Sequence, residues 1–385
     1  MPLLLTLLSL ASAATGLLVP GPSGPYAVGY STLVLTDDSR QDPFAPTPQK
    51  RRVPVSAYLP VDISSRGSKP CPPRTLPYMT PAVAAYYDQG AAQIGLPNDT
   101  FAKYAVTYCD LEKLCAKKPR ASFPLVLFDT GVGPPRSLYG VKARNLASQG
   151  YIVVTVDHPY DAEVVEFPDG SVVKATAFNG TEAEIEHFLK VRGQDLVFVL
   201  SQLQHSRAVR RALLAHYPSA VDFTRVASVG HSLGGVASEL VANMPGSLVR
   251  GAVNMDGGIR EPVLSFGADK PTMQFGRAGH GDTDPSWDAF WARLRGPAVE
   301  LALANATHGT FTDALTLAAP FLTGLPPPVA EALRGELGHI APADAEASIG
   351  GALVAALEFV FEGRKEGIDK IHEHYESLAI VRSHL

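Results

Sequence analysis

The sequence predicts an α/β fold in which helices cover both faces of a mostly parallel, open sheet and the first strands form an antiparallel edge. Three observations support this prediction. Short apolar runs recur along the chain, amphipathic helical patterns separate them, and the length of 385 residues suits one large α/β unit. Because the strands of a parallel sheet are buried on both faces, they are expected to read as continuous apolar runs.

The composition narrows the class of protein. Hydrophobic residues make up 46% of the chain and charged residues 18%, which excludes a disordered or fibrous protein. A net charge of −5 gives no basic surface of the kind that binds nucleic acid or an anionic membrane, so we expect no nucleic-acid partner. No cluster of cysteine and histidine has the spacing of a zinc site, and no metal or organic cofactor is implied.

The N-terminal region has the features of a secretion signal. An apolar run over residues 3–10 is followed by Ala11-Ser12-Ala13, a pattern of small residues that suits signal peptidase. The run is short for a membrane span, and Pro20-Gly21-Pro22 follows it without a basic flank. We therefore predict a signal peptide over residues 1–19, a single domain over residues 20–385, no stable transmembrane segment, and secretion to the extracellular space.

Two further features agree with an extracellular location. Three N-x-[ST] sequons are candidate glycosylation sites, and they begin at Asn98, Asn179 and Asn305. The three cysteines are Cys71, Cys109 and Cys115. They allow one disulfide and one free thiol in any of three arrangements, and a local bridge between Cys109 and Cys115 is one of these.

The first part of the domain is expected to contain antiparallel strands. Residues 26–36 and 52–59 read as two strands joined by a charged, turn-rich segment, which is typical of a hairpin. Residues 60–80 are rich in proline, and we expect irregular structure there.

From residue 124 onward the chain alternates between predicted strands and predicted helices. The strands are expected at residues 124–129, 151–156, 225–229, 248–254, 272–275 and 299–304. The helices are expected at residues 138–149, 183–205, 235–243 and 285–293, with a closing helix at 350–362 and a charged tail after it. Residues 161–192 interrupt the alternation with a tight turn at 167–170. Because long insertions at the carboxyl edge of such a sheet usually shape the binding site, we predict a lid-like insertion there.

A candidate nucleophile lies in Gly230-His231-Ser232-Leu233-Gly234, which has the pattern G-x-S-x-G. The predicted strand 225–229 leads into it and a helical pattern follows it. In a strand–turn–helix elbow the serine adopts a strained backbone conformation, so its neighbours must be glycine. The hydroxyl then lies at a helix N-terminus, whose dipole favours developing negative charge. We predict Ser232 as the nucleophile.

A serine nucleophile needs a base and an acid that orients the base. In this type of fold the chain order is serine, acid, histidine. His308 follows the last predicted strand of the series and is our candidate base, ahead of His280, which follows the preceding strand. The acid is either Asp256, which follows strand 248–254, or one of Asp282 and Asp284 after the next strand. The pattern alone does not choose between them.

The oxyanion of the reaction requires backbone donors. One is expected to be the N–H of the residue after the nucleophile, Leu233, and the other to come from the loop after strand 124–129. That loop reads Thr-Gly-Val-Gly-Pro-Pro over residues 130–135, and its glycines let the backbone approach a carbonyl oxygen. We choose Val132 as the second donor.

Together these stretches resemble the plasma-type, isoform II-like platelet-activating factor acetylhydrolases. The matching stretches are 128–136 (FDTGVGPPR), 146–158 (LASQGYIVVTVDH), 191–196 (VRGQDL), 230–235 (GHSLGG), 254–257 (NMDG) and 307–313 (THGTFTD). Members of that family are secreted or lipid-associated serine esterases of the α/β-hydrolase fold. The resemblance therefore implies this fold, without a cofactor, and a short-acyl ester substrate such as the sn-2 acetyl group of an ether phosphocholine lipid.

The resemblance also bears on the site residues. It implies Asp256 as the acid, His308 as the base, and the Val132 and Leu233 N–H groups as the oxyanion donors. The chain departs from many members at Asp129-Thr130, where they carry Ser-His, and its segment 161–192 matches poorly. A general carboxylesterase or cutinase-like polyester hydrolase is the alternative enzyme. A non-catalytic binding module of the same fold is the alternative of another class.

Overall fold

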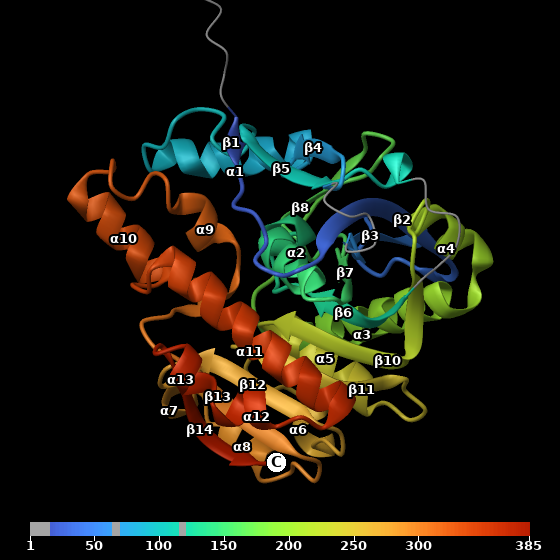
Figure 1. The fold of residues 1–385 in the computed structure, drawn as a ribbon, viewed down its shortest axis with the longest axis vertical. Coiled ribbons are helices and arrows are strands. Elements are labelled where there is room, and N and C mark those ends of the chain that lie inside the picture. The colour runs from blue at the N-terminus through green and yellow to red at the C-terminus, as the bar shows by residue number, and fades with distance from the viewer. Residues whose placement is uncertain (1–15, 64–69, 115–120) are drawn as a thin grey trace, which may run out of the picture.

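The computed structural model describes residues 16–63, 70–114 and 121–385. In these residues twelve strands form one twisted sheet in the order β1-β5-β2-β3-β7-β6-β10-β11-β12-β13-β14, with β4 paired to β5 (Figure 1). The strands are β1 (Leu17–Leu18), β2 (Ala27–Gln41), β3 (Lys50–Val61), β4 (Pro73–Pro77), β5 (Tyr104–Cys109), β6 (Ser122–Asp129), β7 (Ile152–Val156), β10 (Ala220–His231), β11 (Val249–Met255), β12 (Thr272–Arg277), β13 (Ala298–Leu303) and β14 (Leu378–His384). The mostly parallel open sheet that the sequence predicts is confirmed.

Helices and short turns of helix connect these strands. The helices are α1 (Pro81–Gln93), α2 (Gly140–Ser148), α3 (Glu182–His205), α4 (Arg207–Leu213), α5 (Leu233–Asn243), α6 (Val263–Phe266), α7 (His280–Thr283), α8 (Ser286–Trp291), α9 (Ala314–Ala318), α10 (Pro327–Leu337), α11 (Pro342–Glu362), α12 (Glu366–Asp369) and α13 (Ile371–His374). The 3₁₀ turns are η2 (Leu111–Lys113), η3 (Arg136–Tyr139) and η4 (His308–Phe311).

The central six strands, from β7 to β13 in the sheet order, are parallel to one another. Their carboxyl ends therefore meet at one edge of the sheet. Gly230 of β10 pairs with Asp129 of β6, and His231 pairs with Met255 of β11. This register places the loops after β6, β10 and β11 side by side, which is where the sequence locates its candidate site residues.

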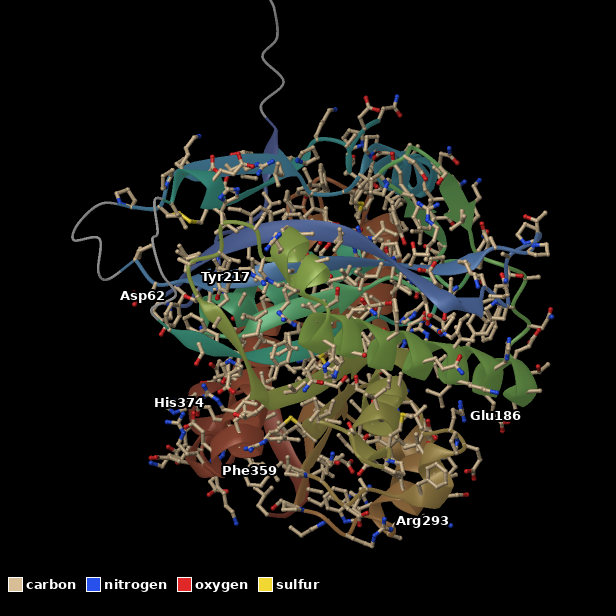
Figure 2. All side chains as sticks on the ribbon, turned by 90° about the vertical axis from the view of Figure 1, so that its right-hand side faces the viewer. Asp62, Glu186, Tyr217, Arg293, Phe359 and His374 are labelled. Carbon is tan, nitrogen blue, oxygen red and sulfur yellow. A yellow bond between two sulfur atoms is a disulfide. The ribbon has the colours of Figure 1, made fainter. Side chains whose placement is uncertain are left out.

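The two faces of the sheet pack against different helices. Leu125 and Leu127 of β6 belong to a core formed with α3 and α5, whereas Val126 and Phe128 belong to a core formed with α2 and α11. This alternation follows from the two-residue period of a strand. Figure 2 accordingly places Phe359 of α11 and Glu186 of α3 on opposite sides of the sheet.

Part of the proline-rich region 60–80, over the described residues 73–77, is regular where irregular structure was predicted. It contains β4, which pairs with β5 in an antiparallel register. The prediction was wrong here because prolines occupy both ends of β4, and proline usually argues against a strand except at an edge or an end. Of the three cysteine arrangements, the structure forms Cys71–Cys109, with the Cα atoms 5.4 Å apart. Cys115 lies outside the described residues.

The N-terminal prediction falls partly outside the described residues, which begin at Gly16. Leu17 and Leu18 form β1 and pair with β5, and Val19 is buried. Leu17 and Leu18, which the sequence assigned to the leader, are therefore part of the sheet, and the Val19 N–H donates to the Ala105 carbonyl of β5 at 2.9 Å. Cleavage after Ala13 would leave them in the domain.

The predicted insertion 161–192 contains a separate hairpin and the first turns of α3. The hairpin consists of β8 (Val164–Glu166) and β9 (Val172–Lys174), and the predicted tight turn lies between them. Asp161 and Arg192, at the two ends of the segment, are both buried.

One described stretch, Pro327–Glu362, is long and apolar enough by composition to cross a membrane. It spans α10 and α11, and half of its most apolar part is buried. Buried residues of α11, such as Ile349 and Leu353, belong to the core that covers one face of the sheet. This packing is typical of a core helix.

The charged tail predicted after the closing helix forms α12, α13 and the edge strand β14. This strand pairs antiparallel with β13, and its Arg382 binds Glu300 of β13. The sequence prediction was wrong because the strand is short, follows a charged segment, and pairs with a strand about eighty residues earlier in the chain.

We expect Leu378→Ala to destabilise the protein. Leu378 of β14 is 2% exposed, and truncation of a buried leucine costs about 2–5 kcal/mol of unfolding free energy. Val381→Ala is the control on the same strand, because Val381 is 56% exposed and should change stability by at most about 0.5 kcal/mol. Equal effects in chemical denaturation would show that β14 does not contribute to the core as described.

Candidate active site

Ser232 lies in a sharp turn between β10 and α5. Its φ of 56° and ψ of −129° are unfavourable for a residue with a side chain. The Ser232 N–H donates to the Met255 carbonyl at 2.8 Å, which fixes the turn against β11. The predicted elbow is present in the structure.

The glycines of the elbow are required by close backbone contacts. A Cβ atom on Gly230 would lie 2.1 Å from the carbonyl oxygen of Gly234. A Cβ atom on Gly234 would lie 2.3 Å from the Thr130 carbonyl oxygen. Real side chains do not tolerate such distances, so the elbow packs directly on the loop after β6.

The structure brings Asp256 and His308 together. His308 Nδ1 lies 2.7 Å from Asp256 Oδ2. Asp256 follows β11 and is buried, whereas the His308 side chain, at the start of η4, is 52% exposed. Among the described residues, Asp256 is the carboxylate that hydrogen-bonds His308. The other two candidate acids, Asp282 and Asp284, do not.

His308 also lies beside the elbow. Its ring packs against the ring of His231, the residue directly before Ser232, with the centroids 4.4 Å apart. His231 itself is buried and receives a hydrogen bond from, or donates one to, the Tyr139 hydroxyl at 2.9 Å. Burial, followed by the nearby His308, lowers the pKa of His231 well below its usual range. A neutral His231 therefore packs beside His308 without adding charge there.

Asp256 is held as a carboxylate by several donors. It accepts hydrogen bonds from His308, from His280 Nδ1 at 2.7 Å, and from the Arg277 N–H and Nη1 at 2.9 and 2.8 Å. Burial by itself raises the pKa of Asp256, but the hydrogen bonds from the two histidines outweigh it and hold that pKa far below its usual range. The acid stays ionised when His308 gains a proton.

His280 is a residue whose contact with Asp256 the sequence did not reveal. The sequence offered it as a second candidate base in a glycine-rich loop. In the structure it is 5% exposed and its ring stacks on Trp287, with centroids 4.1 Å apart. Trp287 in turn donates to the Gly257 carbonyl at 2.9 Å. His280 thus binds the Asp256 oxygen that His308 does not bind. The sequence feature that could have indicated this contact is the position of His280 directly after β12, at the same edge of the sheet as Asp256.

Val132 lies in the loop after β6, one residue from a close contact with the elbow. A Cβ atom on Gly131 would lie 3.3 Å from the Cβ of Ser232. Leu233 opens α5, and the first N–H groups of a helix have no partner within the helix. Leu233 therefore follows Ser232 at the start of α5, and Val132 follows the residue of the neighbouring loop that approaches Ser232.

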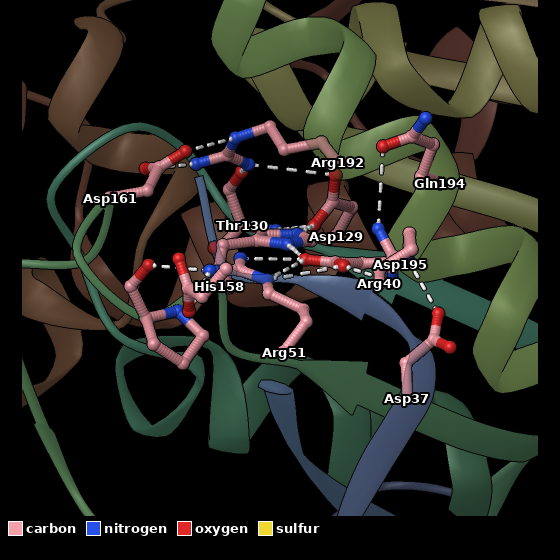
Figure 3. Close-up of polar contacts among 12 residues, drawn as sticks. Asp37, Arg40, Arg51, Asp129, Thr130, His158, Asp161, Arg192, Gln194 and Asp195 are labelled. Atoms are coloured by element: carbon pink, nitrogen blue, oxygen red, sulfur yellow. Dashed lines mark hydrogen bonds and ion pairs between the residues drawn. The ribbon is translucent and has the colours of Figure 1, made fainter. Parts of the chain in front are cut away.

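A buried network of charges lies behind the Val132 loop (Figure 3). His158 bridges two carboxylates, with Nε2 2.6 Å from Asp129 and Nδ1 2.8 Å from Asp195. Burial lowers the pKa of His158, but Asp129 and Asp195 raise it overall to about 9. Asp195 also binds Arg51 at 2.7 Å. Asp129 is therefore fully buried and paired with His158 in the interior.

Other predicted features are exposed at the surface. The three sequon asparagines, Asn98, Asn179 and Asn305, are all exposed.

Within the residues that the structure describes, no group of three or more His, Cys, Asp or Glu side chains is arranged to hold a metal ion.

Comparisons with known proteins agree with this geometry. Residues 98–257 match the family model described as platelet-activating factor acetylhydrolase, isoform II. A probable 1-alkyl-2-acetylglycerophosphocholine esterase from Arthroderma benhamiae is 30% identical over 323 residues, which are 79% of this chain and 78% of that protein. The chain belongs to the platelet-activating factor acetylhydrolase family.

Two further relatives place this family member among the ester hydrolases. The platelet-activating factor acetylhydrolase of Gallus gallus is 24% identical over 58% of this chain and 56% of its own length. The solved structure of a ferulic acid esterase from Streptomyces cinnamoneus is 27% identical, has a TM-score of 0.76, and covers 95% of this chain and 100% of its own. The acetylhydrolase family member is a carboxylic ester hydrolase of the α/β-hydrolase fold.

We expect Asp256→Asn to lower kcat/KM for ester hydrolysis by about 10³- to 10⁴-fold, because the amide would favour the wrong tautomer of His308. Asp282→Asn is the matched control and should leave the rate unchanged, since Asp282 does not contact His308. Steady-state kinetics on a nitrophenyl ester measure both. A larger loss in Asp282→Asn than in Asp256→Asn would contradict the assignment.

The pKa of His158 predicts a pH dependence of stability. The folded-state pKa of about 9 lies above the ordinary value of 6.5. The protonated histidine therefore contributes stability fully below about pH 6.5, and this contribution is lost as pH rises toward 9. Urea denaturation across this range should show the decline in the wild-type protein. The same slope in His158→Gln would rule out His158 as its source.

Proposed function

We propose that this acetylhydrolase family member is a secreted serine esterase that removes short acyl groups, above all the sn-2 acetyl group of 1-alkyl-2-acetylglycerophosphocholine and similar lipids. The observation that carries the mechanism is the 2.7 Å hydrogen bond between His308 and Asp256 beside the strained Ser232. The name of the Arthroderma benhamiae relative supports the substrate.

In the proposed acylation step the Ser232 oxygen attacks the ester carbonyl carbon while His308 Nε2 accepts the hydroxyl proton. The carbonyl π electrons move to the oxygen, and the Val132 and Leu233 N–H groups donate hydrogen bonds to the resulting oxyanion. When the carbonyl re-forms, the C–O bond to the alcohol breaks, and His308 donates its proton to the departing alkoxide. Asp256 holds the His308 Nδ1–H throughout and stabilises the imidazolium.

Deacylation follows the same path with water as the nucleophile. His308 removes a proton from water, the hydroxide oxygen attacks the acyl-enzyme, and Ser232 leaves with the proton that His308 returns. The half-exposed His308 side chain suits this step, because water must reach its Nε2. The low pKa of the Asp256 carboxyl keeps the supporting charge in place as His308 cycles between its two states.

Secretion is supported by three independent features. The leader has a short apolar run and a small-residue pattern, and the sequon asparagines lie at exposed positions. The Cys71–Cys109 disulfide joins residues at the β4–β5 edge. Disulfides persist in oxidising compartments and are rare in the cytosol.

A second candidate is a broader carboxylesterase that accepts aromatic or polymeric esters. The likeness to the Streptomyces cinnamoneus ferulic acid esterase extends over 95% of the chain and favours this alternative. The two candidates share Ser232, Asp256 and His308 and differ only in the groups attached to the ester.

We expect the purified protein to cleave 1-alkyl-2-acetylglycerophosphocholine in preference to its long-acyl analogue, because the family resemblance implies a site for short acyl groups. Hydrolysis is measured by release of acetate or fatty acid, with nitrophenyl acetate and a feruloyl ester run in parallel. Ser232→Ala is the control and should abolish every activity. Cleavage of the feruloyl ester alone would replace the phospholipid assignment with the second candidate.

A further inference from the structure

Two consecutive peptide units of the loop after β6 are held by side chains. In the first, between Thr130 and Gly131, the Thr130 carbonyl accepts from Arg192 Nη1 and the Gly131 N–H donates to the Tyr139 hydroxyl at 2.9 Å. In the second, between Gly131 and Val132, the Gly131 carbonyl accepts from Arg192 Nη2 at 3.0 Å. The remaining polar group of these two units is the Val132 N–H, which has no hydrogen-bond partner within the described residues.

Arg192 is itself fixed in place. Asp161 binds it at two points, with Oδ2 2.7 Å from Nε and Oδ1 2.6 Å from Nη2. Both side chains are at most 2% exposed. A planar guanidinium with two bonds to one carboxylate has a defined orientation, which a flexible ammonium group would lack.

The orientation of Arg192 determines the direction of the Val132 N–H. In a trans peptide the C=O and the N–H of one unit point in opposite directions. Because Arg192 holds the Gly131 carbonyl on its own side, the Val132 N–H must point away from Arg192. The elbow lies against this loop, since a Cβ atom on Gly131 would come within 3.3 Å of Ser232 Cβ.

We propose that Arg192, clamped by Asp161, is a positioning residue that directs the Val132 N–H toward the oxyanion. This inference rests on the proposed function, because it assumes an acyl transfer at Ser232. Arg192 comes from α3 and is 61 residues from Gly131 in the sequence, so the contact is invisible in the local pattern of the loop. Figure 3 shows Arg192 between Asp161 on one side and Asp129 and Thr130 on the other.

The same contacts attach the insertion 161–192 to the oxyanion loop. Glu163 donates its N–H to the Gly133 carbonyl at 2.7 Å, and Ala162 forms a parallel bridge with Gly133. The base of the insertion therefore holds Gly131 through Arg192 and Gly133 through its own backbone. Val132 lies between these two fixed points.

The test compares Arg192→Lys with Arg51→Lys. Both arginines are buried, both bind a carboxylate of the network in Figure 3, and both substitutions keep the charge. Only Arg192 binds the carbonyls of the oxyanion loop; Arg51 binds Asp42, Asp195 and the Pro159 carbonyl. Arg51→Lys thus controls for damage to the buried network.

The readout is the ratio of kcat/KM for nitrophenyl acetate to kcat/KM for the matched thionoester, in which sulfur replaces the carbonyl oxygen. Sulfur accepts hydrogen bonds poorly, so only the oxygen ester gains from a well-aimed N–H donor. We expect Arg192→Lys to lower kcat/KM for the oxygen ester by about 10- to 100-fold and to lower the ratio with it. Arg51→Lys should leave the ratio at its wild-type value.

A loss on both substrates alike in Arg192→Lys would overturn the proposal, because a merely structural role affects the two esters equally. If Arg192→Lys does not fold, Tyr139→Phe provides the test, since it removes the hydroxyl that accepts the Gly131 N–H and that also bonds His231 Nδ1. Its matched control is Tyr78→Phe, whose hydroxyl donates to Asp313 instead. A ratio that falls in Tyr139→Phe supports the positioning of this loop, and an unchanged ratio contradicts it.

Failure of the proposed function is distinct from failure of this inference. A wild-type protein that cleaves neither ester, or a Ser232→Ala variant that still cleaves the oxygen ester, removes the acyl-transfer mechanism itself. A wild-type protein whose activity depends on Ser232, combined with an unchanged ratio in Arg192→Lys, removes only the role of Arg192.

Discussion

The Asp256 carboxylate connects the carboxyl ends of three parallel strands through its hydrogen bonds. It follows β11, it accepts hydrogen bonds from Arg277 at the end of β12 and from His280 after β12, and it binds His308 after β13. A buried carboxylate is costly unless its oxygens are satisfied, and here both of them have partners. The geometry at the serine elbow depends on this group, because the position of His308 relative to Ser232 is set through it.

A second set of buried charges lies on the β6 side of the serine elbow, whereas Asp256 lies on the β11 side. His158 lies between Asp129 and Asp195, and Arg192 lies between Asp161 and the oxyanion loop. Burying charges seldom adds stability, since desolvation offsets much of the attraction. What such a network provides is a fixed arrangement, because any displacement would leave a charge unpaired in the interior. The nucleophile thus lies between two rigid polar groups, one on each side of β10.

The parts of this structure that could be predicted from the sequence are those with a local signature. The strand–turn–helix pattern around Ser232 and the apolar runs of the central strands are of this kind, and the structure has both. The choice of acid was different: Asp256, Asp282 and Asp284 all follow strands at the same edge, so the pattern alone left them open. The family resemblance favoured Asp256, and in the structure Asp256 is the one of the three that pairs with His308.

The contacts that escaped prediction join residues far apart in the chain. Arg192 and Gly131 are 61 residues apart, and β14 pairs with a strand some eighty residues before it. The hydrophobic periodicity of α3 or of β14 does not indicate which distant residue or strand each of them contacts. β4 was missed for another reason, because its prolines contradict strand propensity and its pairing with β5 overrides that preference.

The insertion 161–192 is anchored at its base on the oxyanion loop, whereas its exposed tip contacts β3 through the ion pair between Asp169 and Arg52. Ala162, Glu163 and Arg192 contact the oxyanion loop, and Asp161 holds Arg192. The turn between β8 and β9, at residues 168–171, is exposed and has no hydrogen bond to that loop. Residues at the tip can therefore be exchanged, lengthened or shortened without moving the groups that face the ester carbonyl. The hairpin can therefore vary in sequence and length, in evolution or by design, while the residues at the catalytic edge of the sheet keep their positions.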